Sequence, residues 1–199
     1  MTRKHYFSTK NLVTIALLGS IGAALSTYVG FLAKAVGSSI GLPFGGQLLS
    51  GLHVFWIILV LALVDKKGAG LLAAILDNSV QFMLGSHLGV FVLPVGLLQG
   101  IFAELGYWPL KRYSRILATL LAGGLGTWAN LLVVHFAFRM FGAQSLFRIV
   151  SVCAFASGVV FAGLLPLGIV KILQSAGLAA RTDLPTSSQE ISDRSIVES

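Results

Sequence analysis

Apolar residues form long runs along this chain, and short connections with polar or charged residues separate the runs. A helix needs about 20 predominantly apolar residues to cross a hydrocarbon core of about 30 Å. The runs do not alternate apolar and polar positions, as the strands of a membrane β-barrel would. The pattern therefore predicts an all-α integral membrane protein, a bundle of six transmembrane helices over residues 12–36, 47–64, 68–85, 89–109, 115–137 and 148–172. The third run is short and polar for a span.

The composition is that of a membrane protein. Hydrophobic residues make up 56% of the chain, charged residues make up 11%, and the mean hydropathy is +0.89, whereas soluble domains carry about 25% charged residues. We expect one transmembrane domain over residues 1–180 and a polar, Ser-rich, disordered cytoplasmic tail over residues 181–199. The basic N-terminus could belong to a signal peptide, but the first apolar run continues to about Val36, too far for a cleaved leader.

Lys and Arg residues alternate between the connections. They precede the first run and follow the second, fourth and sixth, whereas the connections 37–46 and 86–88 carry no charge. Arg139 and Arg148 flank the third outer connection. Since cytoplasmic loops carry the excess of Lys and Arg, both termini are predicted to be cytoplasmic. The net charge of +7 follows from this topology. It does not indicate nucleic-acid binding, because no basic stripe with interleaved aromatic residues is present.

Several polar side chains lie inside the predicted spans. Asp77, Asn78 and Gln81 occur in the third run, where helical spacing places them along one side. The predicted orientation puts other polar or amphipathic residues at the same depth, in the outer half of the membrane: His53, Trp56 and Asn130. Such groups normally face a bundle interior or a water-filled cavity.

These polar groups are candidates for a substrate-binding pocket that opens outward. Carboxylate and amide groups at fixed spacing suit a small polar or cationic heterocycle. The predicted site residues are Asp77, Asn78, Gln81, His53, Trp56 and Asn130. The alternative is that they form hydrogen bonds between helices and bind no ligand.

Two further polar residues in the spans are less informative. Glu104 lies toward the cytoplasmic end of the fourth run, where an ion pair with Lys111 or Arg112 is favoured over a ligand contact. His135 lies near the outer end of the fifth run, where an interfacial position explains it as well as a ligand contact does.

Catalytic motifs are absent from the sequence. It contains no HExxH, no serine nucleophile elbow, no Cys or His cluster at metal-binding spacing and no GxxxxGK[ST] phosphate loop. We therefore expect neither an enzyme nor a cofactor or metal site. The chain has no recognisable means of hydrolysing ATP.

Small residues recur at a spacing of four in the first run. Ala16, Ser20 and Ala24 form one such pattern, and Gly19 and Ala23 form a second. Surfaces of this kind let another helix approach closely. The helix that approaches belongs either to a partner protein or to the bundle itself.

Several pieces of the sequence resemble a known family in their order. They are GAGLLAAI at the start of the third run, LG at 84–85, QGIFAE at 99–104, LAGGLG at 121–126 and SGVVFAGLL at 157–165. Over about residues 40–178 the chain resembles the substrate-binding S components of energy-coupling factor (ECF) transporters. It is nearest to the YkoE type, which is associated with thiamine and its hydroxymethylpyrimidine precursor. That branch tends to carry Glu where this chain has Gln81.

The resemblance implies a six-helix bundle with an outward-facing site in the cell membrane. It also implies a complex with a transmembrane coupling protein and two cytoplasmic ABC ATPases, in which Ala16, Ser20 and Ala24 contact the coupling protein. The expected function is capture of a small heterocyclic vitamin or precursor, of thiamine or hydroxymethylpyrimidine type, for ATP-driven uptake. The alternatives are an autonomous carrier in which Asp77 and a histidine relay protons, and a membrane protein without a transport role.

Overall fold

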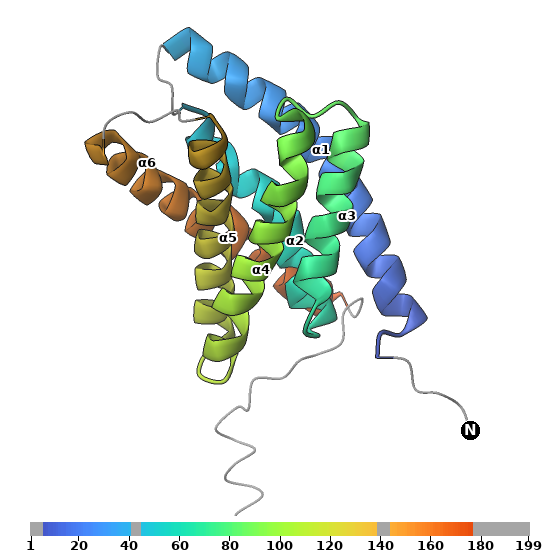
Figure 1. The fold of residues 1–199 in the computed structure, drawn as a ribbon. Helices are drawn as coiled ribbons and strands as arrows, with labels where there is room; N and C mark the ends of the chain where they lie inside the picture. Colours follow the sequence, from blue (N-terminus) through green and yellow to red (C-terminus); the bar gives the residue numbers. More distant parts are fainter. Residues whose placement is uncertain (1–5, 41–44, 139–143, 177–199) are drawn as a thin grey trace, which may run out of the picture.

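A computed structural model describes residues 6–40, 45–138 and 144–176, and all regular elements within these residues are helical. Figure 1 shows the long helices running between the two ends of one bundle. The predicted all-α fold is confirmed. The predicted tail over residues 181–199 and Arg139 lie outside the described residues. The elements are α1 (Thr9–Ile40), η1 (Gly45–Leu49), α2 (Ser50–Val64), α3 (Ala69–Met83), η2 (Gly89–Phe91), α4 (Val92–Lys111), α5 (Arg115–Phe138), α6 (Gln144–Ser157), η3 (Gly158–Leu164) and α7 (Leu165–Ser175).

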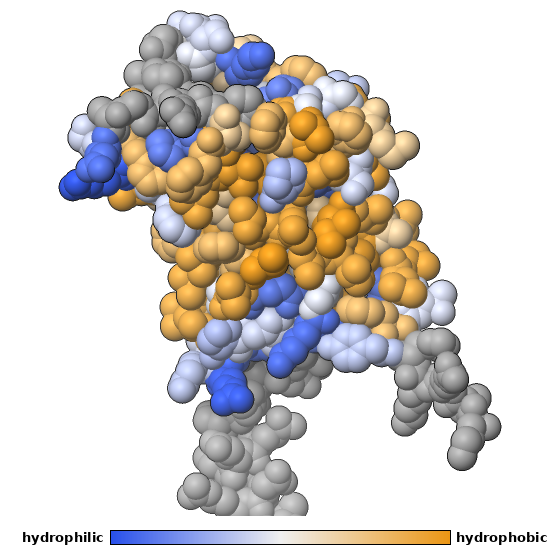
Figure 2. All heavy atoms as spheres, viewed as in Figure 1, coloured by the Kyte–Doolittle hydropathy of each residue, from blue (hydrophilic) through white to orange (hydrophobic). Residues whose placement is uncertain are grey.

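The helix lengths agree with the six predicted spans. Five helical stretches in the described residues are long and apolar enough to cross a membrane, and α3 is a shorter apolar helix of 15 residues. The last of the five, Gln144–Ser175, is interrupted by a π-helix, η3, which joins α6 to α7. Hydrophobic side chains form a broad belt across the middle of the face shown in Figure 2, with hydrophilic side chains toward both ends.

The connections distinguish the two ends of the bundle. The turns between α2 and α3 and between α4 and α5 lie at the end where α1 begins, and the turn between α3 and α4 lies at the opposite end (Figure 1). Lys66, Lys67, Lys111 and Arg112 belong to the first end, which the positive-inside rule assigns to the cytoplasm. We call the opposite end the outer end; its orientation in the cell is a prediction from charge.

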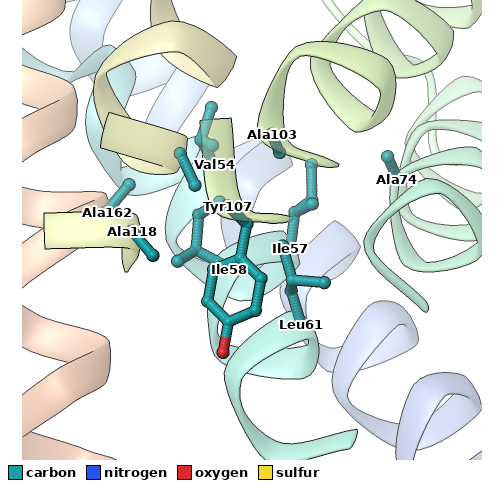
Figure 3. Close-up of a cluster of buried hydrophobic side chains, with 10 residues drawn as sticks. Val54, Ile57, Ile58, Leu61, Ala74, Ala103, Tyr107, Ala118 and Ala162 are labelled. Atoms are coloured by element: carbon teal, nitrogen blue, oxygen red, sulfur yellow. The ribbon is translucent and has the colours of Figure 1, made fainter. Parts of the chain in front are cut away.

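Helix α2 forms the centre of the bundle. Its residues Val54, Ile57, Ile58 and Leu61 are fully buried and form one cluster with Tyr107 of α4 (Figure 3). Neighbouring helices contribute small side chains to the same cluster: Ala74, Ala103, Ala118, Ala122 and Ala162. A helix that is apolar on all sides is stable only when other helices or lipid surround it, and the alanines let those helices approach α2 closely.

Helix α5 and the π-helix η3 approach each other along glycines. A Cβ added to Gly123 would lie 2.6 Å from the carbonyl oxygen of Gly158, and one added to Gly158 would lie 2.4 Å from that of Gly123. No larger residue fits at either position without a shift of the backbone. The LAGGLG and SGVVFAGLL pieces of the sequence therefore meet in space and fix α5 against the last span.

Glu104 has a structural role different from the predicted ion pair. One carboxylate oxygen accepts a hydrogen bond from the Gly70 N–H at 2.9 Å, and the other accepts from the Trp108 indole. The prediction of a pair with Lys111 or Arg112 was wrong, because Lys111 pairs instead with Asp65 at 2.6 Å. Glu104 lies deeper, beside the first turn of α3, whose N–H groups have no partner within the helix. Its carboxylate therefore caps α3.

Candidate functional site

A cavity of about 560 Å³ lies at the outer end of the bundle. Residues of α1, α2, α3, α4, α5 and the short element η1 line it, and its volume is in the range of small-molecule sites. Lys34, Ser38 and His87 are exposed and mark its mouth. The polar lining residues are Lys34, Ser38, Gln47, Ser50, His53, Asn78, Gln81, His87, Gln99 and Asn130. Four of the six predicted site residues, His53, Asn78, Gln81 and Asn130, are thus brought together.

Hydrogen bonds within α3 fix the amides of Asn78 and Gln81. Gln81 Nε2 donates to Asp77 Oδ2 at 2.6 Å, and Asn78 Nδ2 donates to the Ala74 carbonyl oxygen at 2.8 Å. A carboxylate or a carbonyl only accepts, so the amide nitrogens must point toward it. The amide oxygens are then left to accept hydrogen bonds from other groups. On the α4 side, Asn78 packs against Gly96, where an added Cβ would lie 2.5 Å from the Asn78 side chain.

Asp77 and Trp56 face α1 and are not among the residues that line the cavity. A Cβ added to Gly22 of α1 would lie 2.6 Å from the Trp56 side chain and 3.1 Å from Asp77 Oδ1. Asp77 is 1% exposed, and its Oδ1 has no hydrogen-bond partner. Direct ligand contact by these two residues stays a prediction. The geometry gives Asp77 a different role, that of holding Gln81.

Two buried amide oxygens in the cavity lining are without a hydrogen-bond partner. They are Gln47 Oε1 in η1 and Asn130 Oδ1 in α5. A buried acceptor without a partner costs about 1–3 kcal/mol. Both residues line the cavity, but these two oxygens are covered by neighbouring protein atoms, so a ligand would reach them only after the side chains turn toward it.

Ser157 holds η1 in place beside the cavity. Its Oγ donates to the Leu48 carbonyl oxygen at 2.7 Å and accepts from the Gly51 N–H at 3.1 Å. These two hydrogen bonds connect the end of α6 to the residues that flank the turn from η1 into α2. Gln47, one residue before Leu48, is positioned by the same contacts.

Two histidines lie side by side near the mouth of the cavity. The ring centroids of His53 in α2 and His87 in the α3–α4 turn are 6.5 Å apart. Gly30 of α1 contacts both, since an added Cβ would lie 2.5 Å from the His87 ring and 3.4 Å from the His53 ring. Partial burial and the nearby charge of Lys34 lower the pKa of His87. His87 is therefore neutral at neutral pH and offers one N–H donor and one acceptor.

Sequence reasoning missed six polar residues of the lining: Lys34, Ser38, Gln47, Ser50, His87 and Gln99. Gln99 could have been predicted, because it is a polar residue in the middle of the fourth apolar run. Lys34 could also have been predicted, because it is a basic residue near the outer end of a span. Gln47 is the first residue of the second run and His87 lies in a connection, and polar residues are ordinary at both kinds of position.

The remaining candidate residues lie outside the cavity. His135 packs on Phe147 of α6 with ring centroids 4.4 Å apart and does not line it. On α1, Ala16 and Ser20 are exposed and Ala24 is half-buried, whereas Gly19 and Ala23 are buried within the bundle. The second pattern is therefore used in packing within the bundle, whereas the first is left partly open to another helix. Within the described residues, no group of three or more His, Cys, Asp or Glu side chains could hold a metal ion.

Comparison with known proteins identifies the family. Residues 10–129, more than half of the chain, match the family model described as the ABC-type cobalt transport system, permease component. The chain belongs to this family. As a permease component it is a multi-pass protein of the cell membrane and not an enzyme, which confirms both predictions.

Two other proteins are similar to this permease component over most of its length. The YkoE protein of Bacillus subtilis (strain 168), whose name describes an HMP/thiamine permease protein, is 21% identical over 174 residues, which cover 86% of this chain and 87% of the relative. The crystal structure of an S component of an ECF transporter matches with a TM-score of 0.79 and 19% identity, covering 97% of this chain and 98% of that chain. The permease component has the S-component fold, and the resemblance noted in the sequence is confirmed.

Proposed function

We propose that this permease component is the substrate-binding subunit of an ECF-type ABC importer. It captures a small heterocyclic vitamin or precursor, of the thiamine or hydroxymethylpyrimidine type, from outside. The observation that carries this proposal is the cavity at the outer end, which is lined by the carboxamide residues Gln47, Asn78, Gln81, Gln99 and Asn130. The HMP/thiamine name of the YkoE relative supports the ligand class.

The side chains of the cavity suit an aminopyrimidine. Such a ring carries an amino group that donates hydrogen bonds and ring nitrogens that accept them, and a carboxamide pairs with both kinds of atom. Five carboxamides line the cavity: Gln47, Asn78, Gln81, Gln99 and Asn130. The valines at 92, 95 and 134 supply apolar surface for the faces of the ring.

Within this ligand class, the lining favours a pyrimidine without positive charge over thiamine. Thiamine carries a permanent charge on its thiazolium ring, and a buried cation needs a compensating charge. Among the described residues no carboxylate lines the cavity, and Asp77 is held against α1 and bonded to Gln81. We therefore expect hydroxymethylpyrimidine to bind more tightly than thiamine.

Energy for uptake is proposed to come from partner proteins. The sequence has no phosphate loop for ATP. The exposed small residues on α1, Ala16, Ser20 and the half-buried Ala24, are proposed to contact a transmembrane coupling protein that carries two cytoplasmic ATPases. Close approach of a second helix to this stripe is sterically possible because no large side chain projects from it.

Binding and transport experiments test the proposal separately. Hydroxymethylpyrimidine and thiamine are titrated into the purified protein by calorimetry, and uptake is then measured in proteoliposomes. We expect binding by the isolated chain, and uptake only when a coupling protein, ATPases and ATP are added. Uptake by the chain alone on a proton gradient would instead establish the autonomous carrier. Absence of binding by both compounds would contradict the proposed ligand class.

A further inference from the structure

Lys34 occupies an unusual position for a basic residue. It lies in the outer part of α1 and lines the cavity at its mouth. Basic residues concentrate on the cytoplasmic side of membrane proteins, so a lysine at the outer end of a span is not explained by topology. A lysine ammonium near the membrane also needs water or an anion around it. The position therefore calls for a local electrostatic reason.

No acidic side chain of the described residues serves as the partner of Lys34. These residues contain three carboxylates, and each is engaged elsewhere. Asp65 pairs with Lys111 at the cytoplasmic end, Glu104 caps α3, and Asp77 is buried against α1 and bonded to Gln81. The ammonium thus stands at the mouth of the cavity without a counter-charge from these segments.

Neutral donors lie beside this charge. His87 is close enough to Lys34 for their electrostatic interaction to affect its protonation, and its ring lies 6.5 Å from that of His53. Each neutral imidazole offers one N–H. An anionic group at the mouth would meet one ammonium and up to two N–H donors, whereas the deeper amides would hold an uncharged ring.

We propose that Lys34, with His87 beside it, binds an anionic substituent of the ligand, a phosphate or a carboxylate, at the mouth of the cavity. This inference rests on the proposed function and narrows its ligand to an acidic member of the heterocycle class. The heterocycle lies among the amides of α3, α4 and α5, and its acidic group points outward. A phospholipid headgroup also presents a phosphate at this level of the membrane. The same side chains would therefore bind a phosphate from either source, the ligand or the lipid.

Calorimetric titration with two matched probes tests the inference. Hydroxymethylpyrimidine and its phosphate ester share one ring and differ in charge. In detergent free of phospholipid, we expect the ester to bind the wild-type protein about ten- to hundredfold more tightly, since a hydrogen bond to a charged group is worth that much. Lys34→Gln should remove this preference, so that the variant binds the ester no more tightly than the alcohol. Lys34→Arg should keep the preference, and Lys10→Gln, at the other end of α1, should not alter it.

The remaining outcomes separate the possible failures. Equal binding of alcohol and ester by the wild type, or a parallel loss of both in Lys34→Gln, overturns the anion subsite and leaves the proposed function standing. A preference that disappears in nanodiscs containing phosphatidylglycerol shows that Lys34 serves lipid headgroups, which also overturns it. If neither probe binds, the proposed pyrimidine site fails and this inference fails with it. A preference that persists in such nanodiscs supports the subsite.

Discussion

Gln81 donates a hydrogen bond of 2.6 Å to Asp77, one helical turn away on α3, and of the two only Gln81 lines the cavity. The carboxylate holds the amide nitrogen, so the amide oxygen is left for the ligand. Asp77 is covered by α1 at Gly22 and does not need to touch the ligand to influence binding. Gln81 is therefore a contact residue, and Asp77 is a positioning residue.

The first prediction separates these two roles. Gln81→Ala removes a ligand contact, and we expect about a tenfold loss of affinity for hydroxymethylpyrimidine by calorimetry. Asp77→Asn should have a smaller effect, because the new amide oxygen still accepts from Gln81, whereas Asp77→Ala frees Gln81 and should approach the loss seen in Gln81→Ala. An Asp77→Asn variant that binds far worse than Gln81→Ala would make Asp77 the direct ligand contact.

The second prediction concerns Asn130, whose substitution should lower affinity without lowering stability. Asn130→Leu removes a buried acceptor without a partner, so the thermal stability of the ligand-free protein should hold or rise. Affinity for hydroxymethylpyrimidine should fall about tenfold. Thr127→Val is the matched control, since Thr127 is buried one turn away, bonds the Gly123 carbonyl oxygen and does not line the cavity.

The control variant should lose some stability and bind normally. If Asn130→Leu instead unfolds more easily and its folded fraction binds ligand like the wild type, Asn130 joins helices and has no role in recognition.

The third prediction tests the proposed docking stripe on α1. Ser20→Trp should block close approach of a partner helix and reduce ATP-driven uptake severalfold, while ligand binding by the isolated protein is unchanged. Leu25→Trp is the control, because Leu25 is also exposed on α1 but lies on a different side of the helix from Ser20. A parallel loss of binding and uptake in Ser20→Trp would assign this residue to packing within the bundle.

The fourth prediction concerns the cap of α3. Glu104→Ala leaves the Gly70 N–H and the Trp108 indole without their acceptor. We expect the free energy of unfolding in detergent to fall by about 1–3 kcal/mol. The affinity per folded molecule should be unchanged, because Glu104 lies outside the cavity lining. A Glu104→Ala variant of normal stability and impaired binding would contradict this structural role.

Much of the fold could be predicted from the sequence, because span length and hydropathy are local properties. The six runs correspond to α1, α2, α3, α4, α5 and the composite last span. The π-helix η3 was not predictable from hydropathy. It occurs where Gly123 and Gly158 bring two backbones together, which is a relationship between distant segments.

The candidate site could be predicted only in part, because its local spacing can be seen in the sequence but its contacts with distant segments cannot. Helical spacing correctly placed Asp77 beside Gln81, but it could not tell which of them faces the cavity, because the neighbouring residue Gly22 on α1 decides that. Gln47 is positioned by Ser157, more than a hundred residues later in the chain. Lys34 was counted as part of an apolar run, although its charge at the outer end was the signal that mattered.

The central claim is that the outward-facing cavity binds the ligand, and labelling of a cysteine at Ser38 tests it most directly. Ser38 is exposed and lines the mouth, and Cys153 is first replaced by Ala so that Ser38→Cys provides the only thiol. In intact cells a membrane-impermeant maleimide should label this cysteine, and hydroxymethylpyrimidine or its phosphate ester should slow the labelling severalfold. A control cysteine at Ser114, at the cytoplasmic end, should stay unlabelled. Labelling at Ser114 alone, or labelling at Ser38 that neither compound slows, would contradict the account.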